Sequence, residues 1–280
     1  MTNILVPYDF SDQAANALRF ALQFDETQKR TVHVLHVVEL MSRPFLNIEE
    51  EVLTDLKEQV ESKVISRFND EVLGMFSLKD IRIEVQVAFG HISQTILKFA
   101  HSGNMDLIIM GTRGVSGMRE ILIGSNTEKI TRASQIPVIA VKSFVKPDRI
   151  KNIVFPNTLM SDADEDLIVK IKALQHHLGA TLHIVWINTP TNFKKDAVTR
   201  EELKRFSKWY MFKDFTINIY NDINEEAGII NFTHMINADM IALGTHGRKG
   251  LAHLLNGSLA EDLVNHADVP VWTYTIKESD

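Results

Sequence analysis

The stretch GTRG at residues 111–114, followed after nine residues by GSNT at residues 124–127, decides the fold of this chain. It directly follows an apolar run, DLIIM at residues 106–110, that predicts a buried strand. The second Gly-Ser pair opens a helical pattern in which Ser125 and Glu128 have the spacing of a capping box. Free N–H groups and the helix dipole favour an anion at such a strand-to-helix junction. The stretch therefore predicts an anion-binding turn in an α/β protein.

The same arrangement occurs again in the second half of the chain. GTHG at residues 244–247 is followed after nine residues by GSLAE at residues 257–261, and an apolar run again precedes it. One such glycine spacing is weak evidence, whereas two in the same structural setting are strong evidence.

Hydrophobic periodicity extends this interpretation along the first half. Alternating strands and helices indicate a parallel, doubly wound sheet, and Ser11 or Asp12 is expected to cap the first helix. Strands are expected at residues 3–7, 31–38, 81–87, 106–110 and 137–141, and helices at residues 14–22, 53–72, 91–100 and from residue 125.

The pattern then starts again. NIVFP at residues 152–156 repeats NILVP at residues 3–7, and a shorter second helix is expected within residues 193–212. We interpret this as a duplication of one domain, with predicted boundaries at 1–145 and 149–280 joined by a short polar connection.

Composition excludes several classes of protein. A net charge of −6 argues against a generic nucleic-acid binder. The sequence has no run of eighteen or more apolar residues, so no membrane span is expected. No basic leader is visible either, so no secretory signal is expected. The absence of cysteine excludes thiolate chemistry and fits a reducing compartment, so we expect a cytoplasmic protein.

These motifs resemble the universal stress protein family in its tandem form. The family's nucleotide motif, G-x2-G-x9-G-[S/T], is met at Gly111, Gly114, Gly124 and Ser125, and the resemblance covers nearly the whole chain. It implies a five-stranded parallel sheet per domain in the order 3-2-1-4-5, and pairing of the two domains through their last strands. It also implies ATP or AMP between strands one and four, with Mg²⁺ bridging the phosphates.

The resemblance assigns each part of this nucleotide site to positions in the first half. Asp9 is expected to bond the ribose or adenine end, opposite Gly111 across the crevice at the topological switch. The base pocket is expected to be lined by Pro7, Tyr8, Val37 and Met110. The phosphates are expected at the amides of Gly111, Arg113, Gly114, Gly124, Ser125 and Asn126, with hydroxyls of Ser125 and Thr127 and the charge of Arg113 adding contacts.

The second half keeps the glycines but loses other groups. Thr158 stands in place of Asp9, Ile223 in place of Gly90, Ala260 in place of Thr127 and Trp186 in place of His36. A partly degenerate site is therefore expected there, and its candidate residues are Gly244, His246, Gly247, Gly257, Ser258 and Leu259.

The sequence offers little support for metal binding or for other catalytic motifs. The eleven histidines form no HExxH or paired-ligand spacing, so no metal site is predicted, and neither a P-loop nor a GxSxG elbow occurs. No residue is obviously placed to activate water at a γ-phosphate, so at most slow hydrolysis is expected.

Three functions stay open at this point. The first is a nucleotide-dependent stress-response binding or signalling module. The second is a slow ATPase or phosphotransferase that uses Asp9 or His246. The third is an interaction module independent of nucleotide. A pseudo-dimer within one chain is expected, and a homodimer of such chains stays open.

Overall fold

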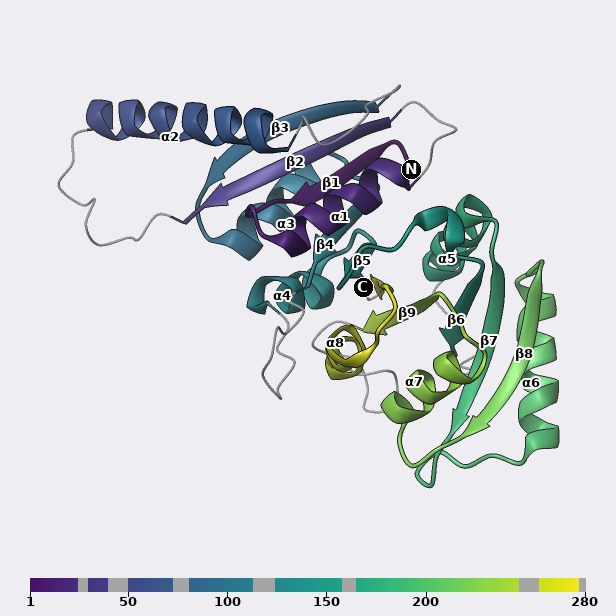
Figure 1. Ribbon diagram of the computed structural model, residues 1–280. Helices are drawn as coiled ribbons and strands as arrows, with labels where there is room; N and C mark the ends of the chain where they lie inside the picture. The colour runs from purple at the N-terminus through teal and green to yellow at the C-terminus, as the bar shows by residue number, and fades with distance from the viewer. Residues whose placement is uncertain are drawn as a thin grey trace.

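One continuous sheet of ten strands runs through the molecule (Figure 1). The computed structural model describes residues 1–24, 30–39, 50–72, 81–112, 124–157, 165–246 and 257–276. The strand order is β3-β2-β1-β4-β5-β10-β9-β6-β7-β8, so each half has the order 3-2-1-4-5 that the resemblance implied. Pairing within each half is parallel throughout. The predicted fold class is therefore confirmed.

Strands and helices alternate in both halves. The first half contains β1 (Asn3–Pro7), α1 (Asp12–Gln23), β2 (Arg30–Val38), α2 (Glu50–Glu71), β3 (Ile81–Phe89), α3 (Ile92–Ser102), β4 (Leu107–Gly111), α4 (Ser125–Ala133) and β5 (Val138–Val141). The second contains β6 (Asn152–Pro156), α5 (Glu165–Leu178), β7 (Thr181–Asn188), α6 (Asp196–Trp209), β8 (Phe215–Asn221), α7 (Glu225–Met235), β9 (Met240–His246), α8 (Gly257–His266) and β10 (Val271–Ile276). A short 3-10 turn, η2 (Pro147–Arg149), lies between the halves, and the domain boundaries at residues 145 and 149 stay a prediction.

Helices cover both faces of the sheet, because alternate strand residues point to opposite faces and apolar side chains lie on both. Apolar side chains of α1, α2, α5 and α6 share one core cluster with residues such as Val6 and Phe155. On the other face, α3 and α4 pack over Leu5, and α7 and α8 pack over Val154. The two halves thus place corresponding helices on the same face of the sheet.

The last strands join the halves. β5 and β10 pair antiparallel, with Ala140 opposite Val271, and this confirms the expected pairing within the chain. α4 and α8 cross the same boundary, where the Arg132 guanidinium lies 3.2 Å from the Glu261 carboxylate. The hydroxyl of Thr275 also donates to the Arg132 carbonyl, 3.3 Å away. Charge and backbone bonding therefore reinforce the strand pairing.

One expectation about the helix starts needs correction. The predicted capping box is wrong, since Gly124 is the N-cap of α4 and Ser125 is already its first residue. The corresponding Ser258 is likewise inside α8 rather than before it. The helix expected at residues 53–72 is present as α2, and within it only Phe68 is buried.

The helices of the described residues are short or polar. None of them combines the length and the apolar character that a membrane crossing requires.

Candidate functional site

The candidate site of the first half lies at the carboxyl ends of β1 and β4. These strands are neighbours, with Leu5 opposite Ile108, and β2 lies on the other side of β1. The chain leaves β1 for α1 on one face and leaves β4 for α4 on the other. This divergence is the topological switch point at which open α/β sheets form a crevice.

Asp9 lies just beyond β1, and its side chain is exposed. Its Oδ1 accepts a hydrogen bond from the Ser11 N–H at 3.0 Å, and the Ser11 hydroxyl also donates to it. Ser11 in turn is the N-cap of α1, as expected, because its Oγ accepts from the Ala14 N–H. The local bonds therefore hold the Asp9 carboxylate in place while Oδ2 has no partner among the described residues.

Gly111 ends β4, and its lack of a side chain has a packing reason. A Cβ at this position would lie 2.3 Å from the Gln13 carbonyl oxygen in the first turn of α1. Gly111 therefore allows α1 to approach the end of β4. The close approach to phosphate that the glycine motif suggested is not needed to explain this glycine.

Gly124 has no such reason among the described residues. Its φ of −58° is open to any residue, and the nearest described atom to a built Cβ would be the Thr127 hydroxyl oxygen at 4.0 Å. Gly124 also leaves the first turn of α4 without a capping side chain. The start of α4 thus presents N–H groups at the switch point, and no described side chain crowds Gly124 there.

Thr127 holds this helix start against the sheet. Its side chain is buried, and its hydroxyl donates to the Gly111 carbonyl at 3.1 Å. We expected this hydroxyl to contact phosphate, but the structure uses it to link α4 to β4. Ser125 is exposed and Asn126 is half-buried, so both stand at the accessible end of α4.

The structure does not bring the expected base-pocket residues together on one face. Val37 and Met110 lie on the face of α3 and α4. Tyr8 instead packs on the face of α1 and α2, edge-on to Phe68 at 5.5 Å. Burial raises the pKa of the Tyr8 phenol, and the nearby Asp9 carboxylate raises it further. Tyr8 is thus a neutral core residue, whereas half-buried Pro7 ends β1 at the crevice.

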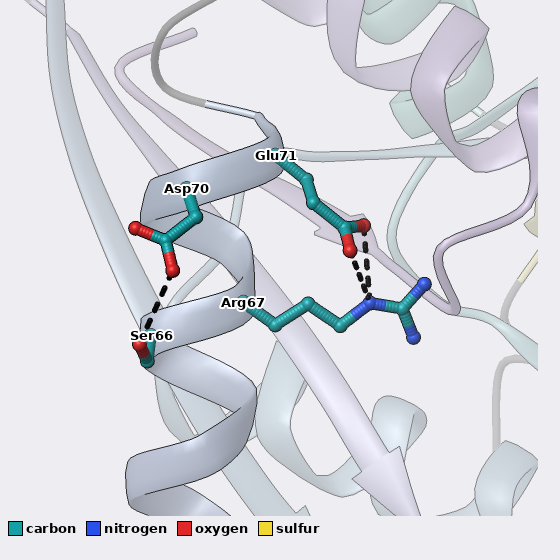
Figure 2. A network of polar contacts seen from close by, with 4 residues as sticks. All are labelled: Ser66, Arg67, Asp70 and Glu71. Atoms are coloured by element: carbon teal, nitrogen blue, oxygen red, sulfur yellow. Dashed lines mark hydrogen bonds and ion pairs between the residues drawn. The ribbon is translucent and has the colours of Figure 1, made fainter.

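An aromatic cluster that the sequence did not predict lies on the face of the sheet covered by α1 and α2. Phe10 has a positive φ of 64° and lies edge-on to Tyr8 and to His36. The Nδ1 of His36 lies 2.7 Å from the Tyr8 carbonyl oxygen. The Arg67 guanidinium lies 4.1 Å from the centre of the Phe10 ring while its Nε pairs with Glu71 at 3.0 Å (Figure 2). Nothing in the sequence signals the unusual backbone of Phe10.

Some of the expected residues lie outside the described part of the chain. These are Arg113 and Gly114 in the first half, and Gly247 and Thr158 in the second. Their assigned roles stay predictions.

The second half differs at its corresponding switch point, between β6 and β9. Gly244 and His246 belong to β9, so the expected loop begins later than predicted. A Cβ on Gly244 would lie 2.4 Å from Leu167 of α5, so this glycine also serves helix packing. Gly257 begins α8, and both Leu259 and Ala260 on this helix are buried.

Hydrogen bonds between side chains connect the segments beyond β7. Asn188 is buried and donates through Nδ2 to the Asn221 side chain at 3.0 Å, while its Oδ1 accepts from the Lys194 N–H at 2.9 Å. The Asn192 amide donates to Glu225 at 3.0 Å. These bonds tie the connection between β7 and α6 to the start of α7, across the end of the sheet that corresponds to the end of β2.

In the described ranges, no three histidine, aspartate or glutamate side chains lie close enough together to hold a metal ion.

Comparisons with known proteins agree with this architecture. A crystal structure of a universal stress protein from Archaeoglobus fulgidus superposes with a TM-score of 0.74 at 20% identity and covers 98% of both chains. This likeness defines the fold class as a tandem α/β protein.

The sequence comparisons then define the family. The model of the universal stress protein family matches residues 1–142 and 221–274, so this chain belongs to the universal stress protein family. Universal stress protein MJ0577 of Methanocaldococcus jannaschii is 30% identical over 151 residues, which is 50% of this chain and 93% of that protein. Universal stress protein YxiE of Bacillus subtilis is 27% identical over 148 residues, or 50% and 97%. Residues 143–220, which the family model does not match, contain β6, α5, β7, α6 and most of β8.

Proposed function

We propose that the first half binds an adenine nucleotide, ATP or AMP, at the switch point between β1 and β4. The observation that carries this proposal is the start of α4. Its N-cap is a glycine that neither packing nor φ requires among the described residues, and no side chain caps the first turn. A helix start of this kind favours phosphate, because its N–H groups and its dipole both attract negative charge.

Asp9 supplies the second wall of the proposed site. Its carboxylate is exposed and fixed by Ser11, and Oδ2 is available to accept a hydroxyl hydrogen from a ribose. Half-buried Val37 and the backbone at Met110 and Gly111 would flank the base on the α3 side. Tyr8 and the Thr127 hydroxyl would not contact the nucleotide. They would hold in place the residues that do.

We further propose that the nucleotide-bound state serves a stress-response binding or signalling role in the cytoplasm. Family membership supports this role. A divalent cation bound with ATP would neutralise phosphate charge, with its remaining ligands from water.

Gly124→Val tests the proposal. The substitution places a branched side chain beside the free N–H groups but meets no described neighbour, so the fold should persist. We expect calorimetry to show at least tenfold weaker ATP binding, on the scale of about 1.4 kcal/mol per tenfold. Gly257→Val at the start of α8 is the matched control and should leave that affinity unchanged. Undiminished ATP binding by folded Gly124→Val protein would show that the site has been misplaced.

A further inference from the structure

Two helices at opposite ends of the sheet expose apolar side chains to solvent. α2 packs along the edge strand β3, and α6 packs along the opposite edge strand β8 (Figure 1). Both helices lie on the same face, because their inward side chains belong to one core cluster. Neither outer surface has a function in the proposed nucleotide site.

α6 exposes a large apolar side chain near each of its ends. Val198 is 50% exposed and Trp209 is 76% exposed, and their spacing of eleven residues is about three helical turns, which puts them on one side. Phe193 before the helix and Met211 after it are also exposed. A tryptophan this open is informative, because large aromatic side chains are rarely left in water without a partner.

Positively charged side chains predominate around and between these apolar side chains. Residues 194–213 contain seven lysines and arginines against three carboxylates. Lys204 pairs with Glu201 at 2.7 Å, whereas Arg205 and Lys208 are exposed and have no ion-pair partner in the described part of the chain. The α6 surface is therefore basic as well as apolar.

The outer surface of α2 carries the opposite charge. Residues 50–71 contain seven carboxylates against three cations, and Val52 and Leu56 are exposed among them. Near the end of the helix the charges are satisfied locally, by Arg67 with Glu71 and by the Ser66 hydroxyl with Asp70 (Figure 2).

The first half of α2 lacks such local pairs. Glu51, Asp55 and Glu58 are exposed, and over the described ranges none of them has an ion-pair partner. These three carboxylates lie within two turns of exposed Val52, so the surface is acidic as well as apolar.

We propose that the α6 surface of one chain docks on the α2 surface of a second copy of this chain. Each surface offers apolar side chains that the other would cover, and their charges attract across the contact. Two α2 surfaces or two α6 surfaces would instead repel each other. Because the contact joins different surfaces, it closes into a ring or pair, or continues as a linear chain.

Sedimentation velocity across a concentration series tests this association. The wild-type chain should associate at low ionic strength and dissociate as salt is raised, because salt screens exposed charges. Trp209→Ser should shift the association to at least tenfold higher concentration. Met235→Ser is the matched control, since Met235 is 59% exposed on α7, which covers the other face, and this variant should associate like wild type.

Charge reversal identifies the two surfaces. An α6 variant carries Lys204→Glu, Arg205→Glu and Lys208→Glu, and an α2 variant carries Glu51→Lys, Asp55→Lys and Glu58→Lys. All six side chains are exposed, so circular dichroism and thermal melts should match the wild type. Each variant alone should be monomeric, whereas an equimolar mixture should associate, since acidic α6 then meets basic α2.

Three results would overturn the proposal. They are a wild-type chain that stays monomeric at low salt and high concentration, a charge-reversed variant that associates like wild type, and a mixture that stays monomeric. If α6 serves an unrelated acidic protein, the first of these results is the one obtained.

Discussion

The hydroxyl of Thr127 donates a hydrogen bond to the carbonyl of Gly111 across 3.1 Å, so one buried side chain joins the start of α4 to the end of β4. This bond sets the position of the N–H groups that face the proposed phosphate site. The second half has Ala260 at the corresponding position, and its small apolar side chain cannot make the link.

Thr127→Val should weaken nucleotide binding without unfolding the chain. The isosteric change keeps the packing but leaves the Gly111 carbonyl without its partner, at a cost of about 1–3 kcal/mol in stability. Calorimetry should show several-fold weaker ATP binding, and Thr127→Ser, which keeps the hydroxyl, should restore most of it. Wild-type affinity in the valine variant would mean that this bond does not position the site.

Gly111→Ala should destabilise the first half. The new Cβ would lie 2.3 Å from the Gln13 carbonyl oxygen. Because both groups are fixed to the backbone, neither can move easily to relieve the clash. Overpacking of this kind costs about 1–3 kcal/mol, which a chemical denaturation curve would detect. Gly124→Ala provides the comparison, because its Cβ meets no described atom closer than 4.0 Å and stability should not fall. Equal stabilities for the two variants would contradict the packing reason given for Gly111.

Asp106 should make the first half sensitive to acid. Burial alone would raise the pKa of this carboxyl, but hydrogen bonds from the backbone N–H groups of Asn3 and Thr2 bring the pKa below its ordinary value of 3.8. Because the folded-state pKa is lowered, the carboxylate stabilises the fold above its unfolded-state pKa, and this stability is lost as the pH falls through the folded value.

Asp106→Asn should therefore cost stability at neutral pH by about 1–3 kcal/mol. The difference from wild type should narrow as the solution is acidified, because the wild-type carboxyl then becomes neutral as well. Denaturation curves from neutral to acidic pH would show this convergence. A difference that stays constant across the range would indicate that the charge of Asp106 is unimportant.

Titration with ATP should show one nucleotide per chain. The side chains of Asn188, Asn192 and Glu225 form hydrogen bonds across the end of β7, which corresponds to the end of β2 in the first half, and we expect these bonds to hinder a second nucleotide. Removing the exposed carboxylate by Asp9→Ala should reduce binding at the single site by about 1–3 kcal/mol. Two equivalent sites in the titration would show that the second half also binds.

The fold was largely predictable because each signal was strong and repeated. The strands expected at residues 31–38 and 81–87 are present as β2 and β3. The family resemblance supplied the strand order, which local patterns do not contain.

The details of the site were less predictable, for reasons that are local and physical. Ser125 has the spacing of a capping residue, yet the chain turns one residue earlier, at Gly124. Tyr8 follows β1 directly, and only the side on which its ring packs shows that it belongs to the core of α1 and α2. The outward apolar residues of α2 also satisfied a helical period without being buried.

The antiparallel pairing of β5 with β10 has a consequence for how this chain can change. Because both strands belong to one polypeptide, their effective concentration is fixed, on the order of millimolar for short tethers, and dilution does not separate them. In a symmetric dimer a substitution would appear twice, once in each subunit. Here it appears once, so one half can keep an open helix start at Gly124 while the other acquires Ala260 and a basic α6.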